Sequence, residues 1–247
     1  MSTRRRFLQV ISQLLFGAAA VETASAEIDF AGARARLVRE IEDDMRATAS
    51  STGRSALSPA VQRALATVPR ERFVPPALAS YAYDNRPLPI GEDQTISQPF
   101  IVALMTELLE PKAGDRVLEV GTGSGYQAAV LAECVAKVYT IEILAPLAAR
   151  ARSTLDAAGY KSVETRTGDG YLGWPEAAPF DGILVTAAPD HVPPVLVEQL
   201  KPGARLVIPV GPRGLTQELL VIRKEADGSA VTRRTILVRF VPLTRSR

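Results

Sequence analysis

The sequence predicts a doubly wound α/β fold with a mostly parallel sheet. The stretch Arg116-Val-Leu-Glu-Val-Gly-Thr-Gly-Ser-Gly-Tyr126 predicts a buried strand that runs directly into a glycine-rich turn. From Asp115 onward, short apolar strands alternate with helical segments, which is typical of a parallel sheet. At 247 residues and 47 % hydrophobic, the chain is long enough to bury the core of one such domain.

The first hundred residues predict a helical extension before the alternation begins. Apolar residues recur with helical spacing over Ala31–Ala47, and Ser58-Pro59 is typical of a helix start. We expect helices at Ala31–Ala47, Pro59–Thr67 and Pro99–Leu109, connections at Ala49–Leu57 and Leu88–Ser97, and an irregular loop packed over the core at Pro69–Pro89.

The alternating part predicts strands separated by helices, followed by strands with no helix between them, which indicates an antiparallel C-terminal edge. The expected strands are Arg116–Val120, Lys137–Glu142, Val163–Thr167, Gly182–Thr186, Arg205–Pro209, Leu219–Arg223 and Thr235–Val241. The expected helices are Tyr126–Cys134, Leu147–Gly159 and Val195–Leu200.

The glycine turn discriminates between cofactors. A dinucleotide fingerprint requires a third glycine where this chain has Tyr126, and a phosphate-binding P-loop requires a Gly-Lys-Ser/Thr that is absent from the turn. An acid followed by G-x-G-x-G is instead similar to the S-adenosylmethionine (SAM) turn of class I methyltransferases. SAM carries an ammonium and a sulfonium, so Glu119 beside the turn suits it. A tight strand–helix turn without a ligand is the alternative.

Two further acids follow the next two strands. Glu142 ends the second strand, about 20 residues after the turn, where an acid binds a ribose diol. Asp169 lies between Gly168 and Gly170 after the third strand, where a carboxylate can accept a hydrogen bond from an adenine amino group. Each acid alone is typical of a solvated surface, but acids at three successive strand ends predict one nucleoside site.

The first 26 residues have the features of an export signal. Thr3-Arg-Arg-Arg-Phe-Leu-Gln9 matches a twin-arginine motif, an apolar run extends from Val10 to Val21, and Ala24-Ser25-Ala26 is a small-residue cleavage site. The run is too short to span a membrane. We therefore expect a signal peptide over 1–26, a single domain over 27–247 and a periplasmic location. A disordered basic tail or amphipathic helix, with a cytoplasmic location, is the alternative.

Composition excludes several function classes. Residues 1–26 hold three of the 29 basic and one of the 27 acidic residues, so the remainder is neutral, which argues against a nucleic-acid substrate. The single cysteine, Cys134, excludes a disulfide framework and a cysteine-based zinc site within one chain. The single histidine, His191, lies in a proline-rich turn, and we expect a structural role for it. We expect no metal, no stable membrane association and a monomer.

Several blocks together resemble the protein-L-isoaspartate O-methyltransferase family, from about Val68 to Thr244. The Thr-Ile-Ser-Gln-Pro and Val-Thr-Ala-Ala-Pro blocks are specific to that family. The blocks are Val68-Pro-Arg-Glu-Arg-Phe-Val-Pro-Pro76, Gln94-Thr-Ile-Ser-Gln-Pro99, the turn Glu119–Tyr126, Gly168-Asp-Gly170, Pro179-Phe-Asp181, Val185-Thr-Ala-Ala-Pro189, Leu200-Lys-Pro-Gly-Ala-Arg-Leu206 and Arg239-Phe-Val-Pro-Leu-Thr244.

The resemblance implies a class I, Rossmann-like SAM methyltransferase that acts on isoaspartyl residues of damaged proteins. It implies that Ser97 is the catalytic residue. The implied cofactor residues are Glu119, Gly121, Gly123, Ser124, Glu142, Asp169 and Gly170, and the implied substrate residues are Thr95, Ile96, Thr186, Ala187, Ala188, Pro189 and Thr244. The leader departs from the family, which is usually found in the cytoplasm, where SAM is made.

Three alternatives remain at this stage. Ser97 precedes a predicted helix, so its hydroxyl can cap that helix instead of orienting a substrate, or do both. The enzyme can methylate another carboxylate or a small molecule, with the same cofactor residues. The chain can also be a module that binds damaged peptides without turning them over, because an exported protein leaves the compartment that supplies SAM.

Overall fold

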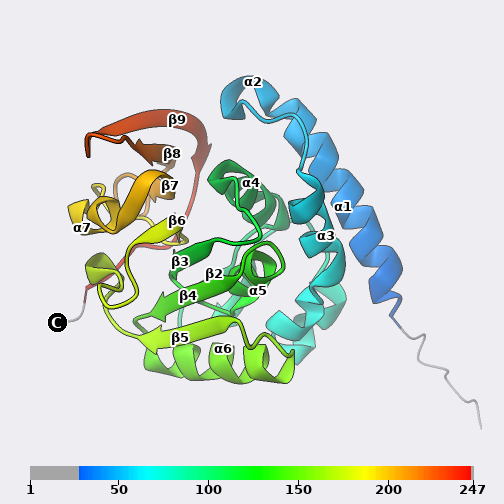
Figure 1. Ribbon diagram of the computed structural model, residues 1–247. Coiled ribbons are helices and arrows are strands. Elements are labelled where there is room, and N and C mark those ends of the chain that lie inside the picture. Colours follow the sequence, from blue (N-terminus) through cyan, green and yellow to red (C-terminus); the bar gives the residue numbers. More distant parts are fainter. Residues whose placement is uncertain (1–27, 246–247) are drawn as a thin grey trace, which may run out of the picture.

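The computed structural model describes residues 28–245, so the predicted signal peptide lies outside the described residues. Helices pack around a central seven-stranded sheet of order β5-β4-β3-β6-β7-β8-β9 (Figure 1), and a two-stranded hairpin forms a second sheet of its own. The strands of the central sheet are β3 (Arg116–Val120), β4 (Lys137–Glu142), β5 (Val163–Thr167), β6 (Phe180–Val185), β7 (Leu200–Val210), β8 (Gln217–Lys224) and β9 (Ala230–Val238).

The predicted fold class is confirmed. The five neighbouring strands β5, β4, β3, β6 and β7 pair in parallel. Strands β8 and β9 extend the sheet beyond β7 with antiparallel pairing. The chain leaves β3 towards β4 and β5, then returns to the other side of β3 at β6. This reversal creates a crevice at the carboxyl ends of β3 and β6, which is where ligands bind in such sheets.

The helices follow the sequence prediction closely where local signals are strong. They are α1 (Phe30–Ala47), α2 (Ala49–Thr52), α3 (Pro59–Thr67), α4 (Pro99–Leu109), α5 (Tyr126–Ala132), α6 (Ala145–Ala157) and α7 (Pro194–Glu198), with 3-10 helices η1 (Arg70–Phe73), η2 (Pro76–Tyr81) and η3 (Gly170–Leu172). Proline is the first residue of α3 and of α4. A backbone N–H at this position would have no acceptor within the helix, so the missing N–H of proline costs no hydrogen bond.

Two apolar layers sandwich the central sheet. On one face, Val117 of β3 and Leu184 of β6 pack with residues of α1, α3, α4 and α5. On the other face, Leu118 and Ile183 pack with Trp174 and with Leu196 of α7. Alternate residues of one strand point to opposite faces, so burial of both faces explains the consecutive apolar residues Val117 and Leu118 of β3 and Ile183–Val185 of β6.

Several predicted segments differ from the structure. Leu88–Ser97 is not a plain connection but an antiparallel hairpin of β1 (Leu88–Gly91) and β2 (Gln94–Ile96). The connection Ala49–Leu57 begins with the short helix α2, and the loop Pro69–Pro89 contains η1 and η2. The last strand ends at Val238 instead of Val241, which frees residues 239–245 to cross the carboxyl edge of the sheet.

Candidate active site

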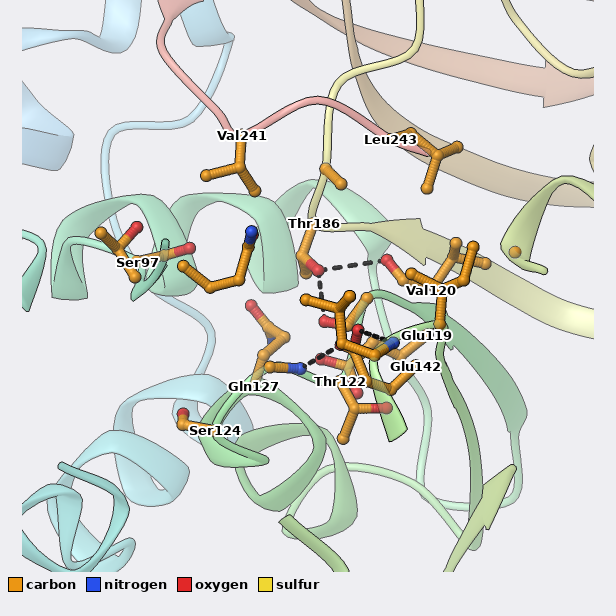
Figure 2. A pocket seen from close by; sticks show the side chains of 18 of the residues that line it. Ser97, Glu119, Val120, Thr122, Ser124, Gln127, Glu142, Thr186, Val241 and Leu243 are labelled. Carbon is orange, nitrogen blue, oxygen red and sulfur yellow. Dashed lines mark hydrogen bonds between the residues drawn. The ribbon is translucent and has the colours of Figure 1, made fainter. Parts of the chain in front are cut away.

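A cavity of about 380 Å3 lies over the carboxyl ends of β3, β4 and β6. The β1–β2 hairpin, the glycine turn and the C-terminal segment also line it. Figure 2 shows Val241 and Leu243 of that segment on one side, with Thr186, Thr122 and Glu142 opposite them. The cavity therefore joins segments that are far apart in the sequence.

The glycine turn has the conformation that its sequence predicts. Gly121, Gly123 and Gly125 all have positive φ, and Gly125 is the N-cap of α5. At Gly121 a Cβ would meet Thr186 Oγ1 at 2.4 Å, while Thr186 Oγ1 donates to the carbonyl of Gly121 at 2.5 Å. Glycine is required at position 121 because Thr186, directly after β6, occupies the space that a Cβ would fill.

Glu119 is fully buried at the base of the cavity. Its Oε2 accepts a hydrogen bond from Thr140 at 2.6 Å, and the Thr122 hydroxyl lies 2.6 Å from that of Thr140. Its Oε1 has no hydrogen-bond partner among the described residues. Burial, and to a lesser degree the nearby charge of Glu142, raise the pKa of Glu119 to about 8.

Glu142 connects the second strand to the glycine turn. Its Oε2 accepts from the Gly123 amide at 2.9 Å, and its Oε1 accepts from the Leu144 amide at 3.0 Å. The side chain is 7 % exposed and lines the cavity. A carboxylate has about four acceptor positions, so two amide donors leave room for further donors such as ribose hydroxyls.

Most of the predicted site residues line this one cavity. They are Thr95, Ile96, Ser97, Glu119, Gly121, Gly123, Ser124, Glu142, Gly170, Thr186, Ala187 and Thr244. Asp169, Ala188 and Pro189 are not among the lining residues.

Those three residues have structural contacts instead. The Asp169 carboxylate accepts from the Tyr171 amide at 2.9 Å and caps η3. Ala188 forms an isolated parallel bridge with Pro242, and the Pro189 carbonyl accepts from the Gly211 amide. The backbone of Ala188 therefore binds the C-terminal segment, and it holds that segment over the cavity.

Ser97 lines the cavity at the end of the β1–β2 hairpin (Figure 2). The alternative role in helix capping is wrong, because the N-cap of α4 is Gln98 and the Ser97 hydroxyl binds no amide in the first turn of that helix. The Phe100 amide is instead bound by Asn85 Oδ1 at 3.1 Å. The Ser97 hydroxyl makes no hydrogen bond among the described residues, which leaves it free to bind a ligand.

Sequence reasoning missed part of the lining. Val241, Pro242 and Leu243 of the C-terminal segment, and Arg213 of the β7–β8 loop, also face the cavity. Arg239–Thr244 belongs to a block quoted above, which could have indicated these three residues, but Arg213 carries no such signal. His191 is exposed, contacts Asp190 and does not line the cavity.

Among residues 28–245, no group of His, Cys, Asp and Glu side chains is arranged to hold a metal ion. Over the same residues, no helix has the length and apolar character needed to cross a membrane.

Comparisons with known proteins agree with the geometry. A family model described as Protein-L-isoaspartate(D-aspartate) O-methyltransferase matches residues 47–247. The chain is 52 % identical to protein-L-isoaspartate O-methyltransferase 2 of Syntrophobacter fumaroxidans over 244 residues, 99 % of each chain. It is 51 % identical to protein-L-isoaspartate O-methyltransferase 1 of Cupriavidus necator, over 98 % of this chain and 93 % of that one.

One solved structure, of a protein-L-isoaspartate O-methyltransferase, is similar at 29 % identity with a TM-score of 0.73. The similarity covers 85 % of this chain but 65 % of that one, so this chain spans just under two thirds of its length.

Proposed function

Because the chain belongs to the protein-L-isoaspartate(D-aspartate) O-methyltransferase family, we propose that it methylates the free α-carboxylate of L-isoaspartyl residues in damaged proteins, with SAM as methyl donor. The observation that carries this proposal is one cavity that combines a cofactor-type glycine turn with Thr95–Ser97 and Thr244. A methyltransferase for a different acceptor would share the turn and Glu142 but would not need the Ser97 block.

The residues around the turn fit SAM. Glu119 offers a buried carboxylate oxygen without a partner, and Glu142 has acceptor positions left over beside Gly123. Gly123 leaves space, since a Cβ there would meet only Ile90 Cδ1 at 3.6 Å. When bound, SAM supplies a methyl group activated by its positively charged sulfur.

The chemistry demands alignment more than acid–base catalysis. The α-carboxylate of an isoaspartyl residue is ionised at neutral pH, so no general base is needed. The protein has to hold that carboxylate in line with the methyl group, and positioning of this kind can supply several kcal/mol. The apolar side chains of Val241 and Leu243 on the lining make the site less aqueous, which favours a reaction that joins opposite charges.

In this proposal Ser97 donates a hydrogen bond that orients the substrate carboxylate. It is not a nucleophile of the acyl-transfer type, because the only histidine of the chain lies outside the cavity. The following backbone nitrogen then attacks the ester carbonyl and expels methanol to give a succinimide, whose hydrolysis returns some normal aspartate. Proximity alone drives that step, so no residue is assigned to it.

The test is methyl transfer from labelled SAM to matched isoaspartyl and aspartyl peptides, with protein that starts at Glu27. Transfer to the isoaspartyl peptide alone is expected. Transfer to neither peptide, with SAM binding intact, would move the assignment to another acceptor or to a non-catalytic binding module.

The resemblance of residues 1–26 to a twin-arginine leader supports a further part of the proposal, namely export of a domain over 27–247 to the periplasm. The twin-arginine route carries folded proteins, so a bound SAM molecule could travel with the enzyme, although it would support one turnover only. The N-terminus of the protein in fractionated cells tests this. A start at Glu27 outside the inner membrane is expected, and a start at Met1 in the cytoplasm would contradict export.

A further inference from the structure

We propose that Arg70 is a positioning residue, which holds the main chain at Ser97 and connects it to the helix that follows the glycine turn. The inference rests on the proposed function, since it assigns the contacts of Arg70 a role in methyl transfer. Arg70 lies in η1, outside the cavity lining, so it cannot act on a ligand directly.

Arg70 is a charged side chain in the interior of the protein. It is 0 % exposed, and no carboxylate forms an ion pair with it among the described residues. Burial lowers its pKa to about 10, and its Nη1 has no hydrogen-bond partner. Burying an arginine without an acidic partner carries a large free-energy cost. A hydrophobic side chain would fill the same space without that cost. The hydrogen bonds and the ring contact of Arg70 therefore indicate the role that offsets the cost of its burial.

Arg70 contacts three separate segments of the chain. Arg70 Nη2 donates to the Ser97 carbonyl at 2.8 Å, and Nε donates to the Ala82 carbonyl at 2.8 Å. The guanidinium carbon lies 4.7 Å from the centre of the Tyr126 ring. Because the guanidinium is a rigid planar fork, these contacts fix the relative positions of the three segments.

Two of these segments belong to different parts of the site, namely the side where the substrate is expected and the side of the glycine turn. Ser97 belongs to the β1–β2 hairpin side, where the substrate is expected, and its own side chain does not cap α4. Tyr126 is the first residue of α5, directly after the glycine turn, and its buried ring also lines the cavity. Arg70 therefore connects the serine to the cofactor turn through the interior.

The consequence for catalysis is geometric. If the Ser97 main chain moves relative to the turn, the hydroxyl no longer orients the carboxylate towards the methyl group. A misplacement of about 1 Å can reduce a rate by about 100-fold. Loss of Arg70 should thus lower kcat, whereas the residues that bind SAM, Glu119 and Glu142, keep their own contacts.

The experiment compares Arg70→Met, Arg70→Lys and the control Arg116→Met. Arg116 is a suitable control because it also lies over a tyrosine ring, that of Tyr139, and donates to the Ala177 carbonyl at 2.8 Å, outside the cavity lining and without touching Ser97. For Arg70→Met we expect kcat on an isoaspartyl peptide to fall about 10- to 100-fold, with the KM for SAM within about threefold of wild type. Arg70→Lys should recover part of kcat, since an ammonium can still donate to one carbonyl, and Arg116→Met should keep wild-type kcat.

A double-mutant cycle separates positioning from general destabilisation. Adding Ser97→Ala to Arg70→Lys should cost much less than Ser97→Ala costs in the wild type, because the serine is already displaced. The lysine variant provides this readout even if Arg70→Met does not fold. Wild-type kcat in both Arg70 variants, or fully multiplicative losses in the cycle, would overturn the inference. Absence of transfer by the wild-type enzyme would instead overturn the proposed function.

Discussion

Thr140 donates its hydroxyl hydrogen to Glu119 Oε2 over 2.6 Å, across directly paired residues of β4 and β3. This is the only hydrogen bond to the Glu119 carboxylate among the described residues, because Oε1 has none. One donor does not compensate for the removal of a charge from water, so the neutral acid is favoured in the folded protein.

We predict that Glu119 makes the stability of the ligand-free protein fall as pH rises. Its pKa is near 4.5 in the unfolded chain and about 8 in the folded protein, so the folded state binds more protons between these values. Its contribution is fully present below about pH 4.5 and is lost as pH rises through about 8. Relative to Glu119→Gln, the free energy of unfolding should fall by up to about 1.4 kcal/mol per pH unit in this window.

Urea unfolding of both proteins from pH 5 to 9 measures this difference, because titration of all other groups is common to the pair. The exposed Glu164, which pairs with Lys137 on the sheet edge, provides the control Glu164→Gln. Parallel curves for wild type and Glu119→Gln would contradict the prediction.

We further predict that SAM binding releases a proton near neutral pH. A cationic ligand beside Glu119 favours the carboxylate over the neutral acid and so lowers its pKa. Calorimetry at pH 7 in buffers of different ionisation enthalpy should detect on the order of one proton released by the wild type. Glu119→Gln should release none, and equal release by both proteins would show that another group is responsible.

For Ser97→Ala we predict normal folding with a strongly reduced rate. The hydroxyl caps no helix and makes no hydrogen bond among residues 28–245, so unfolding free energy should change by less than about 0.5 kcal/mol. Loss of one orienting donor should lower kcat by about 100-fold. Ser58→Ala is the matched control, since Ser58 precedes α3 and also makes no side-chain cap. Wild-type turnover in Ser97→Ala would end the orienting role.

Gly121→Ala should weaken SAM binding and destabilise the protein. The residue has φ of 102°, and its new Cβ would meet Thr186 Oγ1, which also binds the Gly121 carbonyl. The backbone cost is about 1–3 kcal/mol, and displacement of Thr186 adds to it. Gly159→Ala is the control for the backbone cost alone, because φ is 87° there and no atom lies within 4 Å of the added Cβ. Equal effects in both variants, measured by thermal unfolding and SAM titration, would show that the contact with Thr186 is unimportant.

The elements that the sequence predicts well are those with local signals. Strand β3 has the predicted bounds because its apolar run stops at a glycine that needs positive φ. Helices α3 and α4 have the predicted bounds because each begins at a proline. By contrast, β9 was placed too late in the chain, since this edge strand is largely exposed and shows little alternation of apolar and polar residues.

The β1–β2 hairpin was missed for a physical reason. Its turn places Glu92 and Asp93 at positive φ, with φ of 54° for each, and Glu-Asp lacks the glycine that makes Asn-Gly or Asp-Gly a recognisable hairpin turn. Pro89 also interrupts the short first strand, which weakens the pattern.

By itself, the sequence determined the fold class, the glycine turn and the family, because each depends on residue types at short, regular spacing. Only the tertiary structure decided which residues meet. It placed Thr244 over the cavity through the pairing of Ala188 with the C-terminal segment, and it turned Asp169 to cap η3 instead of lining the cavity. It also buried Arg70 between Ser97 and Tyr126. Such contacts join segments far apart in the chain, and their energies depend on burial, which local sequence patterns do not encode.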